Sequence, residues 1–121
     1  MKGFGNKHRS IKKKENLDKS KIINEAIKYH QDGNILKAAK AYQACINQGL
    51  KDQRVYSNYG LILKGLGNLE EAESSYRKAI EINPNFAEAY YNLGNILKDL
   101  GKSNESELAY KKAIQIKPNF A

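Results

Sequence analysis

The sequence predicts an all-α protein made of three helix-turn-helix units. Three observations carry this prediction: the chain repeats itself every 34 residues, its apolar residues recur at helical spacing, and each expected turn contains a glycine. Residues 53–86 align with residues 87–120 without a gap, and residues 19–52 align more weakly in the same register. We therefore expect three repeats with these bounds, of which the first has diverged most.

Each repeat is expected to contain two helices of about 14 residues joined by a short turn. In the second repeat Tyr56, Tyr59 and Leu63 recur at spacings of three and four residues, which places them on one face of the first helix. Glycine suits the end of that helix, because the backbone φ angle there is often positive. The turn glycines are Gly33, Gly67 and Gly101.

Small residues occupy the column in which the two helices of a repeat are expected to cross. Ala26, Gly60 and Gly94 share this column, and a bulkier side chain there would hold the two backbones apart. Pro84 and Pro118 follow the second helices of their repeats, where proline prevents the helix from continuing.

Residues 1–18 are expected to form a basic arm in front of a repeat domain that covers residues 19–121. The arm carries six lysine and arginine side chains against two carboxylates, a net charge of +4 out of +8 for the whole chain. It has few apolar side chains to bury, so we expect it to be mobile. Its cations offer an alternative function as an adaptor for nucleic acid or an anionic membrane, with weak nonspecific nucleic-acid contact as the mildest form.

Composition argues against several other classes of protein. No apolar run reaches about 18 residues and no secretory signal is present, so we expect a soluble, cytoplasmic protein. Cys45 is the only cysteine, which leaves no internal disulfide and no support for a zinc site. His8 and His30 lie in different parts of the chain, and no catalytic set of nucleophile, base and acid can be assembled. We expect no enzyme activity, no metal and no cofactor.

Eight columns of the second and third repeats match a known family pattern. They hold Tyr56, Tyr59, Gly60, Leu63, Ala72, Tyr76, Ala79 and Pro84 in the second repeat, and Tyr90, Leu93, Gly94, Leu97, Ser106, Tyr110, Ala113 and Pro118 in the third. These residues resemble the signature of the tetratricopeptide repeat, and the resemblance covers residues 19–121. It implies a right-handed α-solenoid. The last two repeats are similar to those of bacterial, particularly cyanobacterial, proteins and of the superhelix in O-linked N-acetylglucosamine transferases.

Three residues depart from the family pattern. Ser106 and Cys45 stand where the family prefers alanine, and Leu50 replaces the proline that closes the first repeat. These changes leave the predicted fold unaltered.

The resemblance implies a concave groove lined by the first helix of each repeat. Asn24, Asn58 and Asn92 share one inward column. A side-chain amide both donates and accepts hydrogen bonds, so it can bind a backbone unit of a peptide whatever its side chain. The asparagine ladder of the glycosyltransferase superhelix is similar. The alternative is that asparagine is merely tolerated on a solvated face, or that the third repeat inherited it by duplication.

The neighbouring inward positions are expected to form a mixed apolar and polar wall, which suits a partner with apolar side chains and some acidity. A clamp for chaperone-tail carboxylates, in contrast, needs a lysine and an asparagine one helical turn apart in the first repeat, where this chain has Ile23 and Ile27. We therefore disfavour that subclass. The wall positions are Ile23, Ile27, Ser57, Leu61, Tyr91 and Asn95, with Lys64 and Lys98 at the edge.

The expected binding is weak. Three asparagines making two hydrogen bonds each, at about 1 kcal/mol net per bond, supply roughly 6 kcal/mol, whereas association costs about 4–15 kcal/mol. Apolar anchors, further repeats or avidity must supply the remainder.

The last residues copy the entry to a further repeat, since Pro118-Asn119-Phe120-Ala121 matches Pro84-Asn85-Phe86-Ala87. We expect a fragment or a truncated member of a longer array, whose uncapped last helix promotes end-to-end self-association. The predicted function is a protein–protein interaction scaffold that binds an extended peptide or partner protein in the groove. The other alternative is a targeting module of a longer enzyme.

Overall fold

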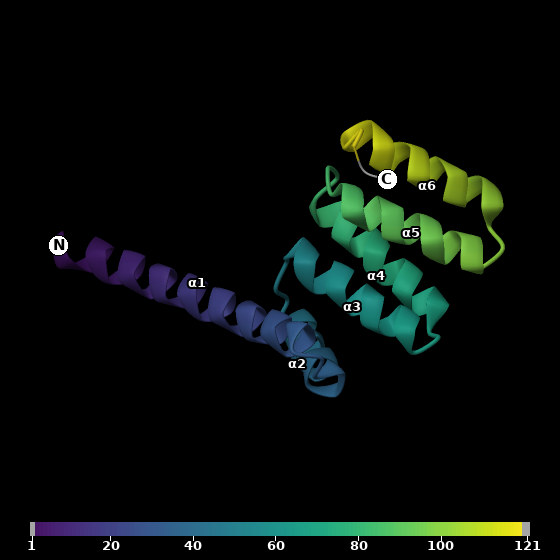
Figure 1. Ribbon diagram of the computed structural model, residues 1–121. Coiled ribbons are helices and arrows are strands. Elements are labelled where there is room, and N and C mark those ends of the chain that lie inside the picture. Colours follow the sequence, from purple (N-terminus) through teal and green to yellow (C-terminus); the bar gives the residue numbers. More distant parts are fainter. Residues whose placement is uncertain (1, 120–121) are drawn as a thin grey trace. The chain divides into compact units, whose positions relative to one another are not determined.

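The structure, a computed structural model, describes the backbone of residues 2–119 and the side chains of residues 13, 14 and 18–119. Six helices and no strand lie in this described part, which confirms the all-α helical-repeat prediction. The helices are α1 (Lys2–Gln31), α2 (Ile35–Asn47), α3 (Gln53–Gly65), α4 (Leu69–Ile82), α5 (Ala87–Asp99) and α6 (Ser103–Ile116) (Figure 1).

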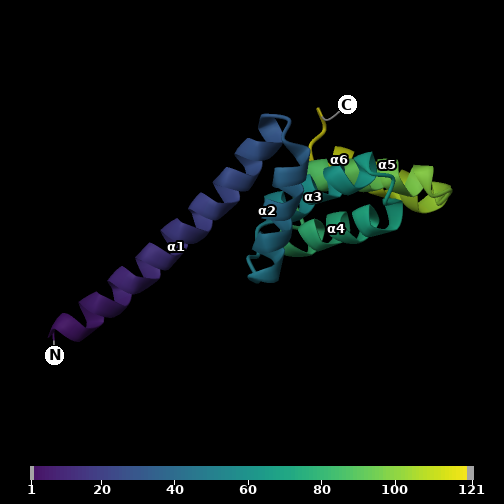
Figure 2. The same ribbon diagram turned by 90° about the horizontal axis from the view of Figure 1, so that it is seen from below.

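The chain divides into two compact units, Met1–Leu50 with α1 and α2, and Lys51–Ala121 with α3 to α6. In the first unit α1 packs against α2. In the second, α3 pairs with α4 and α5 pairs with α6, while α5 also contacts both α4 and α3 (Figure 2). The second unit therefore consists of two stacked hairpins that correspond to the predicted repeats at residues 53–86 and 87–120.

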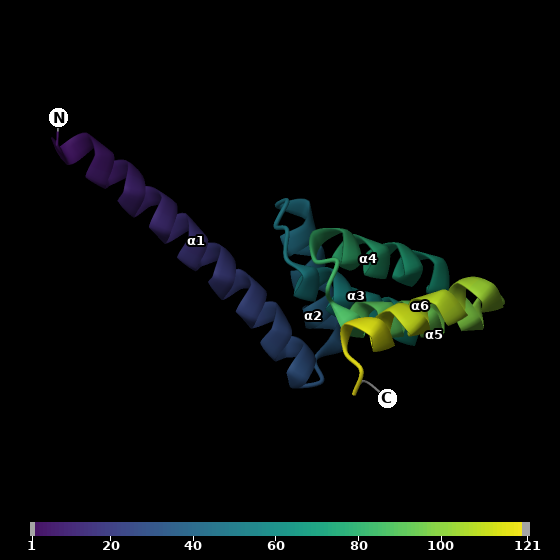
Figure 3. The same ribbon diagram turned by 90° about the horizontal axis from the view of Figure 1, so that it is seen from above.

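Helix α1 is longer than the predicted first helix of repeat one. It contains 30 residues and passes residue 18 without a break, so the predicted arm and the first repeat share one helix (Figure 3). The reason is that lysine and glutamate favour helix and no proline stands before Pro84. The mobility predicted for the arm stays a prediction.

Glycines with a positive φ angle end the first helix of each repeat, as predicted. Gly67 has φ +82° and Gly101 has φ +79°. The following N–H groups then turn back onto the helix, so that Asn68 N donates to the Leu63 carbonyl at 2.9 Å and Lys102 N donates to the Leu97 carbonyl at 2.8 Å. This bond pattern satisfies carbonyl groups that the helix end would leave without partners.

The first repeat ends in a different way because Leu50 replaces the expected proline. Gly49 takes a φ angle of +74°, and Leu50 N donates to the Cys45 carbonyl at 3.1 Å. Leu50 itself is buried. A glycine turn thus ends α2, whereas Asn83 and Pro84 follow α4.

The core of the second unit lies between its four helices. Tyr76 of α4 and Leu93 and Leu97 of α5 are among its buried members, and Ala109 joins them from α6. Each Å² of apolar surface removed from water contributes about 25 cal/mol of stability, so burial of this cluster is the main stabilising contribution. The buried cluster consists of Leu63, Ala72, Tyr76, Leu93, Ile96, Leu97 and Ala109, with Tyr59, Leu69, Ile80 and Leu100 packed against it.

The predicted crossing column is confirmed for the second and third repeats. A Cβ atom added to Gly60 would lie 2.8 Å from the Tyr76 ring, and one added to Gly94 would lie 2.6 Å from the Tyr110 ring. Both separations are shorter than a normal carbon–carbon contact. The missing side chain therefore makes room for a tyrosine from the second helix of the same repeat.

Ser106, which departs from the family alanine, is buried and satisfied. Its hydroxyl donates to the Gly94 carbonyl at 2.8 Å. The bond ties the start of α6 to the middle of α5, so the additional polar atom is not left without a partner.

Among the described residues, no helix combines the length and the apolar character needed to cross a membrane.

Candidate functional site

A tyrosine from the second helix of each repeat carries its hydroxyl group toward the first helix. Tyr42, Tyr76 and Tyr110 occupy this shared column, and the surroundings of their hydroxyl groups differ. In the first unit, the Tyr42 hydroxyl lies 3.2 Å from His30 Nδ1. Burial lowers the pKa of His30, so its neutral form is favoured there.

In the third repeat, the hydroxyl group finds a partner on α5. Tyr110 donates to Asn95 Oδ1 at 2.5 Å, and the rings of Tyr110 and Tyr91 lie 5.7 Å apart with an interplanar angle of 51°. Tyr91 and Asn95, one helical turn apart, thus both contact the same side chain of α6. Two of the predicted site residues are brought together in this way, and the amide of Asn95 is held in one orientation.

In the second repeat, the equivalent hydroxyl has no partner. Tyr76 is fully buried, and its hydroxyl oxygen makes no hydrogen bond within the described part of the chain. The column that holds Asn95 in the third repeat holds Leu61 here, which offers no acceptor. Burial and, secondarily, the Glu88 carboxylate raise the pKa of Tyr76, so the group stays protonated.

The predicted asparagine column is placed on three different helices. Asn58 on α3 and Asn92 on α5 are both half-buried, and these two helices are in contact within the second unit. Asn24 lies on α1 of the first unit and is exposed. Asn58 and Asn92 therefore form the part of the column that a single unit holds.

The other predicted residues divide by exposure. On α3 and α5, Leu61 is 37% exposed and Tyr91 is 36% exposed, so both offer apolar surface beside the asparagines. Lys64 is half-buried and Lys98 is exposed, and Ile27 of α1 is half-buried. We name the surface of Asn58, Leu61, Tyr91, Asn92 and Asn95 the asparagine face.

Two of the predicted wall positions are wrong. Ile23 and Ser57 are buried, at 6% and 2% exposure, so neither lines an open surface. Ile23 is three residues before Ala26, which is also buried, and this spacing directs both toward the same side of α1. Ser57, the equivalent residue of the second repeat, is likewise turned into the core. Of the three residues in this column, Ile23, Ser57 and Tyr91, only Tyr91 is exposed.

An ion-pair group joins the second repeat to the third. Glu73 of α4 accepts from Arg77 Nε at 2.9 Å and from Lys102 Nζ at 3.1 Å. Burial alone would raise the pKa of Glu73, but the hydrogen bonds from these two cations outweigh it and hold the pKa below its ordinary value. Lys102 belongs to the turn after α5, so this contact fixes the two hairpins against each other.

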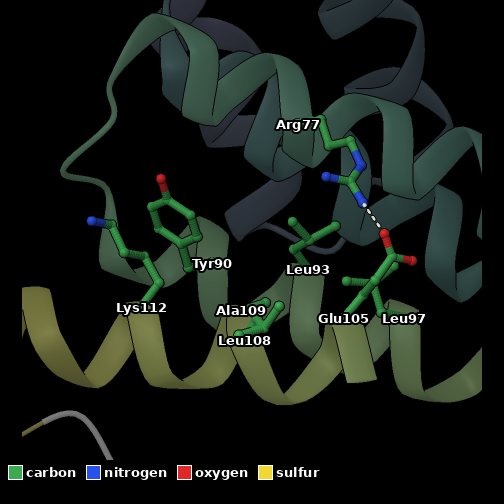
Figure 4. Close-up of a pocket in the computed structure, with 8 residues that line it drawn as sticks. All are labelled: Arg77, Tyr90, Leu93, Leu97, Glu105, Leu108, Ala109 and Lys112. Atoms are coloured by element: carbon green, nitrogen blue, oxygen red, sulfur yellow. Dashed lines mark ion pairs between the residues drawn. The ribbon is translucent and has the colours of Figure 1, made fainter. Parts of the chain in front are cut away.

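A pocket of about 230 Å³ lies among α4, α5 and α6. Its floor is formed by side chains of α5, and Arg77 of α4 faces Glu105 of α6 across one end at 3.9 Å (Figure 4). None of the predicted site residues takes part in it. The lining residues are Arg77, Tyr90, Leu93, Leu97, Glu105, Leu108, Ala109 and Lys112.

This pocket was not predicted from the sequence, although one residue difference accompanies it. Leu108 is 66% exposed, and the same column of the second repeat holds Ser74. A single exposed leucine is common on protein surfaces, so this residue points to a site only together with the pocket that it lines. A column-by-column comparison of exposed positions would have found the residue difference.

Within the described residues, no cluster of histidine, cysteine, aspartate or glutamate side chains is arranged to hold a metal ion.

Sequence comparison identifies the repeat. A family model described as TPR repeat matches residues 60–101, and one described as tetratricopeptide repeat matches residues 87–120. Together with the helix pairs and their 34-residue period, these matches define a helical-repeat protein. The chain belongs to the tetratricopeptide-repeat family. No curated protein sequence matches it at a significant level.

Solved structures with the same fold include the first TPR of Spaghetti (RPAP3) bound to the HSP90 peptide SRMEEVD. That structure has 21% identity and a TM-score of 0.76, over 84% of this chain and 80% of the other. MamA has 22% identity and a TM-score of 0.79, over 93% of this chain and 66% of its own. The TPR2B domain of yeast Sti1, in a pHsp70 complex, has 25% identity and a TM-score of 0.76, over 86% and 83% of the two chains. These likenesses concern the fold.

Proposed function

We propose that this chain is a protein-interaction module that binds an extended peptide or a partner protein on the asparagine face. The observation that carries the proposal is that Asn58 and Asn92 are both half-buried and lie on two helices in contact. Two amides one repeat apart offer donors and acceptors to a peptide backbone. Leu61 and Tyr91 beside them offer apolar surface, and Lys64 and Lys98 offer positive charge at the edge.

The structural neighbours support the general class of this function. The RPAP3 and Sti1 domains were solved with HSP90 and Hsp70 peptides, respectively. For this chain we propose peptide or protein binding without adopting those partners. Ile23 is buried and Ile27 is half-buried where a carboxylate clamp would need a lysine and an asparagine. The bound segment is therefore expected to be recognised through its backbone and apolar side chains.

The proposed function is tested by affinity capture with the full chain. The double variant Asn58→Ala, Asn92→Ala should lose at least about tenfold in captured partner, because two rungs of about 1–2 kcal/mol each are removed. The matched control is Asn68→Ala, Asn104→Ala, which removes two exposed asparagines outside the asparagine face. Equal capture by wild type and the Asn58, Asn92 variant would move the partner to another surface.

Three other functions stay predictions: nucleic-acid contact through the basic half of α1, end-to-end self-association, and a place within a longer enzyme. The first has the clearest test, because counterion release makes such binding steeply dependent on salt. Binding of a DNA duplex that weakens steeply between 50 mM and 200 mM salt would favour it. Peptide capture that survives this change in salt would favour the asparagine face.

A further inference from the structure

The pocket among α4, α5 and α6 lies outside the asparagine face. Its sides are formed by the two second helices, α4 and α6, while Leu93 and Leu97 of α5 lie at its floor (Figure 4). Both floor residues are buried members of the core. The pocket is therefore built on the rigid part of the second unit, and its shape does not depend on a loop.

The two ends of the pocket differ in charge pairing. At one end, Arg77 is bound to Glu73 at 2.9 Å and faces Glu105 at 3.9 Å. At the other end lie Tyr90 and Lys112 (Figure 4). Lys112 is exposed and makes no ion pair within the described part of the chain. Arg77 is thus already paired with Glu73 and Glu105, and Lys112 is the cation at the rim that is available to a partner.

The wall of the pocket contains an apolar side chain that is largely exposed to solvent. Leu108 is 66% exposed, and the equivalent position of the preceding repeat is occupied by Ser74. Next to it, Ala109 replaces Ser75, whose hydroxyl donates to the Tyr56 carbonyl at 2.6 Å. Two neighbouring hydroxyl groups of α4 are thus replaced by apolar groups on α6, at the pocket.

The volume decides what the pocket accommodates. A cavity of about 150 Å³ holds a benzene ring, and sites for drug-sized ligands begin at about 300 Å³. At about 230 Å³, the pocket has room for one large apolar side chain. The ring of Tyr90 at its edge favours an aromatic guest, because offset and edge-to-face ring contacts are attractive.

We propose that this pocket is a second docking site, which takes one phenylalanine-like side chain from an acidic segment of a partner protein. The ring fills the space between Leu108 and the α5 floor, and a neighbouring carboxylate pairs with Lys112. The site would act together with the asparagine face, since two weak contacts on one module bind more tightly than either alone. It does not depend on the asparagine face being occupied.

The test is an NMR titration of the ¹⁵N-labelled full chain with the peptide acetyl-Asp-Glu-Phe-Glu-Asp-amide. We expect amide shifts around Tyr90, Leu108 and Lys112. Replacing the phenylalanine of the peptide by alanine should abolish the shifts, and replacing its acids by amides should weaken binding about threefold. Shifts confined to Asn58 and Asn92, or no shifts up to millimolar peptide, would overturn the proposal.

Variants of the chain separate docking from a general effect on folding. Leu108→Ser should weaken binding at least about fivefold, with an otherwise unchanged spectrum because the side chain is exposed. The matched control, Ile114→Ser, removes an exposed apolar residue of the same helix outside the pocket and should leave affinity unchanged. Equal affinity for wild type and Leu108→Ser would contradict the proposal. So would shifts of pocket residues that grow with protein concentration alone, because a second copy would then be the occupant.

Discussion

The second and third repeats have the same backbone plan but satisfy their polar groups differently. Each places a tyrosine against a glycine of the facing helix. The Tyr110 hydroxyl is bound by Asn95, whereas the Tyr76 hydroxyl is buried without a partner in the described structure. The packed columns fix the fold in both repeats, while the adjacent surface columns are free to diverge. Those surface columns are where the two repeats differ in binding potential.

The largest expected effect comes from the crossing glycines. Gly60→Ala should destabilise the protein by about 1–2 kcal/mol, because overpacking costs about 1–3 kcal/mol and the gain in helix propensity returns up to about 1 kcal/mol. Gly94→Ala should cost less, since half-buried Tyr110 can yield toward solvent and enclosed Tyr76 cannot. Urea unfolding measures both. A larger loss of stability for Gly94→Ala than for Gly60→Ala would contradict the greater freedom assigned to the Tyr110 ring.

Removing the tyrosine hydroxyl groups should have opposite consequences in the two repeats. Tyr110→Phe should destabilise by about 1 kcal/mol, because it removes a hydrogen bond. Tyr76→Phe should be neutral or stabilise by up to about 1 kcal/mol, because it removes a buried hydroxyl with no partner. The midpoint of thermal unfolding should therefore fall for Tyr110→Phe and stay unchanged or rise for Tyr76→Phe. Equal losses would indicate that Tyr76 has an acceptor after all.

The missing acceptor for the Tyr76 hydroxyl can be supplied by placing in the second repeat the residue that the third repeat has at the equivalent position. Leu61→Asn should supply the acceptor that Asn95 provides for Tyr110. In a double-mutant cycle with Tyr76→Phe, we expect a favourable coupling of about 0.5–1 kcal/mol between Asn at position 61 and the hydroxyl. A coupling near zero would show that the two groups do not meet in the second repeat.

The smallest expected effect concerns pH and Glu73. Its pKa is held below the ordinary value of 4.5 by Arg77 and Lys102. The unfolded chain therefore binds this proton at higher pH, so the stabilisation is present above about pH 4.5 and is lost as pH falls through the folded pKa. Glu73→Gln should flatten the acid limb of the stability profile. Glu107→Gln, the equivalent change in the third repeat, should alter it little, because the Glu107–Lys111 pair is exposed.

Much of the fold was predictable because apolar residues and turn glycines recur at fixed spacings along the sequence. The turn at Gly67 and the crossing of Gly60 with a facing helix follow from column and residue type alone. The length of α1 did not follow, since a charge-rich segment such as Lys12–Lys14 is typical of both disorder and a solvated helix.

The candidate site was less predictable than the fold. Ile23 and Asn24 are neighbours in sequence, yet one is buried and the other exposed, because each step around a helix turns the side chain by about 100°. The bond between Tyr110 and Asn95 joins two helices, so no spacing within one helix indicates it. Asn58 and Asn92, in contrast, are both half-buried, and their role in binding stays a prediction.

Site-specific photo-crosslinking determines whether a partner binds on the asparagine face. The photoreactive residue p-benzoylphenylalanine replaces Tyr91 on that face or, as a control, Glu71, an exposed residue of α4 that does not line the pocket among α4, α5 and α6. We expect the captured partner to crosslink from position 91 and not from position 71. A crosslink from position 71 alone would contradict binding on the asparagine face.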